Sequence, residues 1–302
     1  MAQYDLMMAR AKRPNGIELE YTTTGSPSDP PLMLVMGFTA QLTAWPEQLV
    51  RGLADRGRFV ITHDNRDCGL SSKLDGVEVD QIAVIEALGS GEPSAIKGKV
   101  PYSLSDMSDD AFAVLDDLGL ETAHIAGASM GGMIVQAMAI EHPERVRTLT
   151  SIMSNTGEIE YGQSLPEAQA ALLAPPPTDR AGVVEFASRA LIWSSKRYAD
   201  VEAMKERAGL AYDRAFYPEG ALRQMGAILS YGSRADALRG LSVPTLVIHG
   251  VDDSLIAPSG GERTAELIPD AKLMMVADMG HDLPLPLVPT LIDAIIEHTD
   301  RA

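Results

Sequence analysis

The residues best suited to chemistry form the run Gly127-Ala128-Ser129-Met130-Gly131. This run follows an apolar, strand-like stretch at His124–Ala128 and opens a helical pattern at Met130. A strand, a tight turn and a helix form the setting of a nucleophile elbow, in which the serine hydroxyl stands above the sheet. The helix start also directs free N–H groups and a positive dipole end at the site, where negative charge would develop. We therefore predict Ser129 as a nucleophile, with a glycine-rich turn that has no chemistry as the alternative.

A nucleophilic serine needs a base, and the base needs an acid to orient it. Asp252 and Asp253 follow the strand-like run Thr245–His249, and His281 follows the run Leu273–Val276. Functional groups of open α/β sheets gather at the carboxyl ends of the strands. The chain order serine, aspartate, histidine is the order found in α/β-hydrolases. We expect His281 to be the base and Asp253 to orient it, with Asp252 as a turn residue.

The remaining histidines do not suit the role of the base, because none lies in the right chain order on a loop that follows a strand. Their spacing is not that of metal ligands. Cys68 is the only cysteine, so it forms no internal disulfide and no cysteine-based metal cluster. The sequence therefore predicts neither a metal nor a cofactor. The histidines in question are His63, His124, His142, His249 and His298.

Acyl chemistry also needs two backbone N–H groups that stabilise an oxyanion. One is expected from Met130, which directly follows the serine. The second is expected from Phe38, in the loop after the apolar run Leu32–Met36, where Gly37 allows a close backbone turn. An ordinary loop aromatic is the alternative interpretation of Phe38.

Short β-rich runs recur along the chain and alternate with helical patterns. Several of them are almost continuously apolar, as strands buried on both faces are. The alternation predicts an α/β fold, with a mostly parallel sheet covered by helices on both faces. The runs are Leu32–Met36, Phe59–His63, His124–Ala128, Leu149–Met153, Thr245–His249 and Leu273–Val276.

Local signals place further elements. Asn15-Gly16 between the runs Leu6–Ala11 and Ile17–Thr23 predicts a hairpin, because both turn residues tolerate positive φ. Ser103 followed by Asp106 is typical of a helix cap. The helices expected from such signals run from Ser103 to about Leu118, from Met130 to Ile140 and from Asp282 to Thr299, the last interrupted early by prolines.

Residues 155–240 break the alternation, because they contain no convincing strand. Apolar residues at spacings of three and four between Val201 and Ala211 indicate a helix with one apolar face. We interpret 155–240 as a helical cap inserted into a core made of residues 1–154 and 241–302.

The composition of the chain excludes some classes of binding partner. The chain has 25 Lys and Arg against 42 Asp and Glu, a formal net charge of −17. Such a chain repels phosphate backbones on average, so nucleic acid is excluded as a partner. No apolar run approaches the roughly 20 residues that span a bilayer, so no membrane insertion is expected. The first five residues lack the pattern of a secretory signal, which predicts a cytoplasmic protein.

With these residues in view, the chain resembles capped esterases of the α/β-hydrolase superfamily, especially the group of aclacinomycin methylesterase and related actinobacterial carboxylesterases. The resemblance implies Ser129 as nucleophile, His281 as base and Asp253 as orienting acid, with oxyanion N–H groups from Met130 and Phe38. The runs that carry it are Leu34–Gly37, Trp45-Pro46, Asp64–Ser71, Gly127–Gly132, Pro244–Gly250 with Asp253, and Met279–His281.

One position departs from the family pattern. Many members have a histidine where this chain has Met36. The oxyanion donor is a backbone group, so the departure concerns how the loop is braced. Asp64 and Arg66 match a widespread family motif whose role is chiefly structural, and we do not count them as catalytic.

These observations together predict a serine hydrolase that cleaves carboxylic esters of medium-sized hydrophobic molecules, with the ester and water as its partners. Acyl transfer to an alcohol, perhydrolysis and cleavage of lactones or thioesters use the same residues and stay open, as does a non-catalytic protein that binds a small ligand. Aromatic and apolar residues of the cap are more often packing than ligand contacts. As pocket residues we expect Trp193, Met225 and Leu229.

Overall fold

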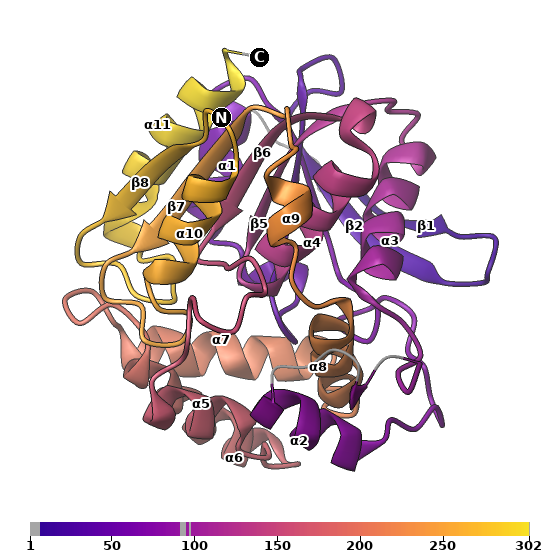
Figure 1. Cartoon of the computed structure of the whole chain (residues 1–302), viewed down its shortest axis with the longest axis vertical. Helices are drawn as coiled ribbons and strands as arrows, with labels where there is room; N and C mark the ends of the chain where they lie inside the picture. The colour runs from indigo at the N-terminus through magenta and orange to yellow at the C-terminus, as the bar shows by residue number, and fades with distance from the viewer. Residues whose placement is uncertain (1–6, 91–94, 97, 302) are drawn as a thin grey trace.

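The apolar runs form one eight-stranded sheet in the computed structural model, which describes residues 7–90, 95–96 and 98–301. The strand order is β1-β2-β4-β3-β5-β6-β7-β8. β2 pairs antiparallel with β1 and with β4, and the other neighbours pair parallel. The predicted α/β fold with a mostly parallel sheet is thus confirmed (Figure 1). The strands are β1 Met7–Lys12, β2 Glu18–Thr24, β3 Pro31–Val35, β4 Phe59–His63, β5 Ala123–Ala128, β6 Val146–Ile152, β7 Thr245–Gly250 and β8 Lys272–Val276.

The predicted hairpin is confirmed as the pair β1 and β2. In its turn only Gly16 takes up a positive φ, of +89°, while the Asn15 side chain accepts a hydrogen bond from the N–H of Ile17. Asparagine here closes the turn through its side-chain oxygen rather than through a left-handed backbone. Leu6 and the five residues before it lie outside the described residues.

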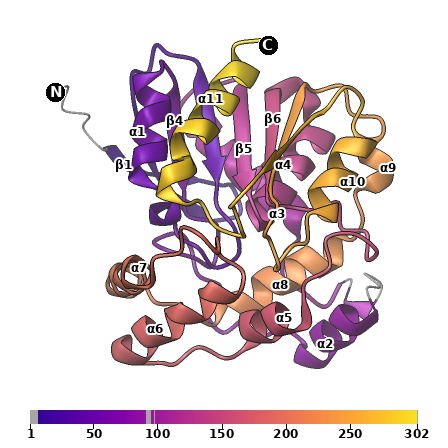
Figure 2. The same ribbon diagram turned by 90° about the vertical axis from the view of Figure 1, so that its left-hand side faces the viewer.

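Helices cover both faces of the sheet. α1 and α11 lie on one face, and α3, α4 and α10 lie on the other (Figure 2). The central strands β3, β4, β5 and β7 are buried along their whole length, which accounts for their continuous apolar sequence. No helix among the described residues has the length and apolar character to cross a bilayer. The α-helices are α1 Glu47–Asp55, α2 Gln81–Ser90, α3 Leu104–Asp117, α4 Met130–Glu141, α5 Pro166–Leu173, α6 Arg180–Phe186, α7 Val201–Arg214, α8 Gly220–Tyr231, α9 Ala235–Leu238, α10 Ser259–Leu267 and α11 Val288–Thr299.

Helix ends follow the local signals in one case and depart from them in another. Ser103 and Asp106 form the predicted capping box at the start of α3. The last helix begins only at Val288 instead of Asp282, because the prolines at 284 and 286 cannot donate the backbone hydrogen bonds of a helix interior. Residues 285–287 form a short 3-10 turn in place of the first helical turns.

Residues 155–240 contain helices α5 to α9 and no strand. α5 to α8 lie together with α2 at one end of the sheet (Figure 1). α9 differs from them, because Ala235 and Leu238 pack in the hydrophobic core beside the sheet. The two ends of this segment lie side by side. There the N–H of Arg234 donates to the carbonyl oxygen of Thr156 at 2.8 Å.

Arg234 is buried at this crossing point, and no acidic side chain of the described residues pairs with it. Its guanidinium donates to the side chain of Gln136 at 2.9 Å and to the carbonyl oxygens of Asn155 and Gly232. Burial lowers the pKa of Arg234 to about 10. The guanidinium therefore ties both connections of the 155–240 segment to α4 by neutral hydrogen bonds.

Two arginines from the segment form buried ion pairs with the loop after β4. Arg214 at the end of α7 donates to Asp64 at 2.7 Å. Arg223 of α8 donates to both oxygens of Asp67, at 2.8 and 3.0 Å. Both aspartates are fully buried, so the pairs replace the water that the carboxylates lose on folding.

We expect the Arg223→Met substitution to lower the free energy of unfolding by about 3–5 kcal/mol, because it leaves the Asp67 carboxylate buried without its ion-pair partner. Urea unfolding followed by circular dichroism measures this. The matched control is Arg180→Met, since Arg180 pairs with Asp213 on the surface of the same segment, where an ion pair contributes little. Equal losses in the two variants would contradict the assignment.

Candidate active site

Ser129 occupies a strained turn between β5 and α4. Its backbone has φ of 58° and ψ of −122°, a combination that residues with a side chain rarely adopt. Such strain costs about 1–3 kcal/mol and is maintained where the surroundings fix it. Here the N–H of Ser129 donates to the Ile152 carbonyl oxygen at 2.9 Å, and the Ser154 hydroxyl donates to the Ser129 carbonyl oxygen at 2.8 Å.

The glycines around Ser129 are required by close backbone contacts. A Cβ on Gly127 would overlap the carbonyl oxygen of Gly131, and a Cβ on Gly131 would overlap that of Val35. A Cβ on Gly132 would lie 2.5 Å from the Ser154 Cβ. The elbow thus packs directly on the end of β3, where no side chain fits between the two backbones.

The structure brings the three predicted side chains together from three strand ends. The Nε2 atom of His281 lies 2.9 Å from the Ser129 hydroxyl oxygen. Its Nδ1 atom lies 2.7 Å from Oδ2 of Asp253. Ser129 follows β5, Asp253 follows β7 and His281 follows β8. Asp252 forms no hydrogen bond or ion pair with the imidazole, and its N–H donates to the Met279 carbonyl oxygen.

Asp253 is held as a carboxylate. Its Oδ1 atom accepts hydrogen bonds from the N–H groups of Leu255 and Ile256, both at 2.9 Å. Burial raises the pKa of Asp253, but the charge of His281 and the hydrogen bonds from His249 and His281 outweigh burial and lower it to about 2. The carboxylate is therefore ionised at neutral pH and faces the Nδ1 side of His281.

His249 is a neighbour of this site to which the sequence analysis gave no role. It is fully buried, and its Nε2 atom lies 2.8 Å from the Ile256 carbonyl oxygen and 3.4 Å from Oδ2 of Asp253. The ring thus supports the turn that carries Asp253. The other histidines lie elsewhere, and the described residues contain no group of three or more histidine, cysteine or acidic side chains that could hold a metal ion.

The loop with Gly37 and Phe38 lies against the elbow. A Cβ on Gly37 would lie 2.9 Å from the Cβ of Ser129 and 3.0 Å from the Ala128 carbonyl oxygen. Among the described residues, no protein acceptor takes the N–H of Phe38 or that of Met130. The two N–H groups named from the sequence thus belong to adjoining backbones, and their role as oxyanion donors stays a prediction.

Two buried amide side chains brace this loop, and the sequence analysis gave neither of them a role in the site. Asn65 donates from Nδ2 to the carbonyl oxygen of Met36 at 2.8 Å. Gln224 of α8 accepts from the N–H of Thr39 at 2.8 Å and donates to the Arg66 carbonyl oxygen at 2.9 Å. The loop with Gly37 and Phe38 is therefore held by Asn65, in the loop after β4, and by Gln224, in the 155–240 segment.

The residues expected to line a substrate pocket lie in packed clusters. Trp193 packs with Ala168 and Leu255, and its carbonyl oxygen accepts the N–H of His281. Met225 packs against α2, with Leu229 partly buried against the same cluster. These contacts agree with packing inside the helical segment, and a pocket role for the three residues stays a prediction.

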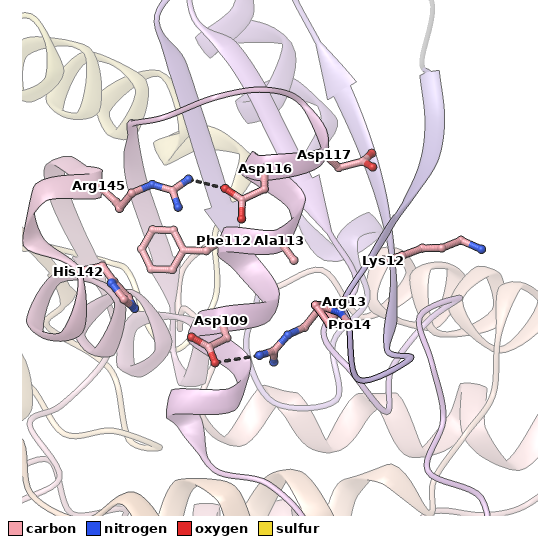
Figure 3. A pocket seen from close by; sticks show the side chains of 10 residues that line it. All are labelled: Lys12, Arg13, Pro14, Asp109, Phe112, Ala113, Asp116, Asp117, His142 and Arg145. Carbon is pink, nitrogen blue, oxygen red and sulfur yellow. Dashed lines mark hydrogen bonds and ion pairs between the residues drawn. The ribbon is translucent and has the colours of Figure 1, made fainter.

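Two surface clefts lie apart from Ser129. One is bordered by residues 75–81 and 217–223. The other lies between the β1–β2 turn, α3 and the end of α4 (Figure 3). Its basic groups are already paired, Arg13 with Asp109 and Arg145 with Asp116. Neither cleft contains a residue of the Ser129 site.

Comparison with known proteins agrees with this architecture. A family model described as alpha/beta hydrolase fold matches residues 30–286. The rhodomycin D methylesterases DauP of Streptomyces sp. (strain C5) and DnrP of Streptomyces peucetius are each 28% identical, over 92% of this chain and 93% of their own. The enol-lactonase from Burkholderia xenovorans LB400 shares the fold with a TM-score of 0.72 at 21% identity, over 97% of this chain and 100% of the other. The esterase RhEst1 from Rhodococcus sp. ECU1013 gives 0.72 at 20% identity, over 97% and 98%.

We expect Gly131→Ala to destabilise the protein by at least about 1–3 kcal/mol, because the new Cβ overlaps the backbone of β3. The urea midpoint measures the loss. Gly89→Ala is the matched control, since Gly89 also lies within a helix, but apart from its chain neighbours and its own helix no atom of the described residues would lie within 4 Å of a Cβ there. There the change should be neutral or stabilise by up to about 1 kcal/mol. A tolerated alanine at position 131 would contradict the contact with β3.

Proposed function

The chain belongs to the α/β hydrolase fold family, and from this premise we propose that it is a carboxylic ester hydrolase with Ser129 as nucleophile, His281 as base and Asp253 as the acid that orients His281. The observation that carries the proposal is the continuous hydrogen-bonded series from Ser129 through His281 to Asp253, at 2.9 and 2.7 Å. Serine, imidazole and carboxylate in this arrangement activate a hydroxyl for acyl transfer.

In the proposed reaction the Ser129 oxygen attacks the ester carbonyl carbon while Nε2 of His281 takes the hydroxyl proton. The C–O bond to the alcohol then breaks, and His281 returns the proton to the leaving oxygen. Water repeats the sequence on the acyl-enzyme, giving the acid and free Ser129. The carboxylate of Asp253 stabilises the imidazolium present between the two proton transfers.

We assign the oxyanion to the N–H groups of Met130 and Phe38. Three features support the pair: neither group has a protein acceptor among the described residues, the loop of Phe38 lies against Ser129 at Gly37, and the start of α4 adds its dipole. Loss of one such donor costs about 3–4 kcal/mol in the barrier. Since both donors are backbone groups, the braces at Asn65 and Gln224 protect the geometry on which they depend.

For the substrate we propose an ester of a medium-sized hydrophobic molecule, with a methyl ester as the first candidate. The two relatives at 28% identity are methylesterases by name, and they match the chain over 92% of its length. Residues 155–240 would act as a cap over Ser129, with α9 packed on the core. The expected pocket residues are Trp193, Met225 and Leu229.

We expect Ser129→Ala to lower kcat/KM on p-nitrophenyl esters by about 10⁴-fold or more, because the nucleophile is lost. Ser28→Ala, at an exposed turn, is the matched control and should keep full turnover. A panel that varies acyl and alcohol size separately defines the substrate, and an added alcohol separates hydrolysis from acyl transfer. Ser129→Ala that keeps wild-type turnover would remove the proposal.

The pH profile gives a second test. Because His281 must be neutral to accept the proton, kcat/KM should fall as the pH is lowered and the free enzyme takes up a proton. The pKa of Asp253 is about 2, so this carboxylate stays ionised throughout and adds no second step. A plot of log kcat/KM against pH should therefore have a limiting acid slope of one. A flat profile, or a slope of two, would contradict the assignment.

A further inference from the structure

The loop that carries His281 is fixed by the 155–240 segment rather than by the sheet alone. The backbone N–H of His281 donates to the carbonyl oxygen of Trp193 at 2.6 Å. A Cβ on Gly280 would overlap the same carbonyl oxygen. The backbone that carries the imidazole therefore lies in direct contact with residues 193–195, which belong to the connection between the 3-10 helix 187–192 and α7.

Asp282 joins the two backbones. Its Oδ1 atom accepts the N–H of Ser195 at 3.0 Å and the N–H of Gly280, in its own loop, at 3.2 Å. One carboxylate oxygen thus fixes the spacing between the segment and the residue before His281. Among the described residues, no hydrogen bond or ion pair joins Asp282 to Ser129. An effect of Asp282 on the rate would therefore be exerted through His281.

The same connection also reaches the loop of the acid. The hydroxyl of Ser254, the residue after Asp253, donates to the Ile192 carbonyl oxygen at 2.9 Å. Residues 192–195 are therefore bonded to both loops whose side chains meet at the imidazole. A displacement of this connection would change the distances on both sides of the ring.

The loop also offers an internal comparison. Asp278 lies on the other side of His281 and pairs with Arg197 at 2.9 Å, but this pair is exposed on both sides. Exposed pairs of this kind contribute little. The two aspartates are thus alike in chemistry and loop, and differ in whether they bond the backbone beside His281.

We propose that Asp282 is a positioning residue, which aligns the imidazole of His281 by bonding the His281 loop to the backbone of Ser195. The inference rests on the proposed function, because it assigns a role toward the proposed base. The base acts in both acylation and deacylation, so misalignment lowers kcat. It leaves the substrate contacts in place, so KM stays nearly constant. An error of about 1 Å in such alignment can cost about 100-fold in rate.

Three variants separate the acceptor from the charge. Asp282→Ala removes both, Asp282→Asn keeps an acceptor oxygen without the charge, and Asp278→Asn removes a charge at the exposed comparison position. We expect Asp282→Ala to lower kcat on a p-nitrophenyl ester about 10- to 100-fold with KM within about threefold. Asp282→Asn should restore most of kcat, and Asp278→Asn should match the wild type.

Turnover is expressed per active serine, counted by complete labelling with a fluorophosphonate, so that a loss of folded protein does not count as a loss of rate. If Asp282→Ala yields no folded protein, Gly280→Ala takes its place. That variant keeps Asp282 but forces the Trp193 carbonyl away from the loop, and kcat should fall with KM nearly constant.

A wild-type kcat in Asp282→Ala overturns the inference. If Gly280→Ala is used instead, a wild-type kcat in that variant overturns it. So does a change confined to KM, which would indicate a role in substrate binding, and so does an equal loss in Asp282→Asn and Asp282→Ala, which would indicate a charge effect. The Ser129→Ala variant distinguishes a failure of the positioning role from a failure of the proposed function. An inactive Ser129→Ala beside a fully active Asp282→Ala removes the positioning role alone, whereas turnover in Ser129→Ala removes the proposed function itself.

Discussion

The approach of two backbones, at the elbow after β5 and at the end of β3, is the constraint on which the rest of the structure depends. The elbow can hold Ser129 at positive φ only because Gly127 and Gly131 leave room for neighbouring carbonyl groups. The same absence of side chains lets Gly37 lie against Ser129. The positions of the proposed nucleophile and of the proposed oxyanion donors therefore depend on the packing of these backbones, and the strain of the turn is balanced by the sheet and helix on either side of it.

The buried carboxylates around the site have partners that take the place of water. Asp64, Asp67 and Asp253 each face a cation or N–H groups that compensate the loss of water. Several of these partners come from the 155–240 segment. The segment thus contributes to the stability of the loops beneath it, and Arg214, Arg223 and Gln224 make it part of the framework of the site. The chain has a strong net negative charge, but each of these three buried carboxylates is balanced by a cation or by N–H groups.

Much of this site could be predicted from sequence, because its three side chains each follow a strand whose apolar run is a local signal. Ser129, Asp253 and His281 lie where the runs end, and parallel strands bring their carboxyl ends to one edge. Gln224 could not be found in this way. Its partners at positions 39 and 66 lie more than 150 residues away in the chain, and no local spacing records a contact made by docking two segments. α2 was missed for a different reason: Ile82 and Ile85 are exposed while alanines face the core, so its apolar residues do not mark the buried side.

The crossing point at Arg234 gives the molecule a modular character. Because residues 155–240 begin and end on adjacent backbone, bonded between Arg234 and Thr156, this segment could be exchanged as a unit with no change in the order of the strands. The sequence of a replacement segment would be constrained, however. It would have to present an amide for the loop at Thr39 and cations for two buried aspartates, so diversity of the insertion is compatible with a fixed reaction only within those three anchor points.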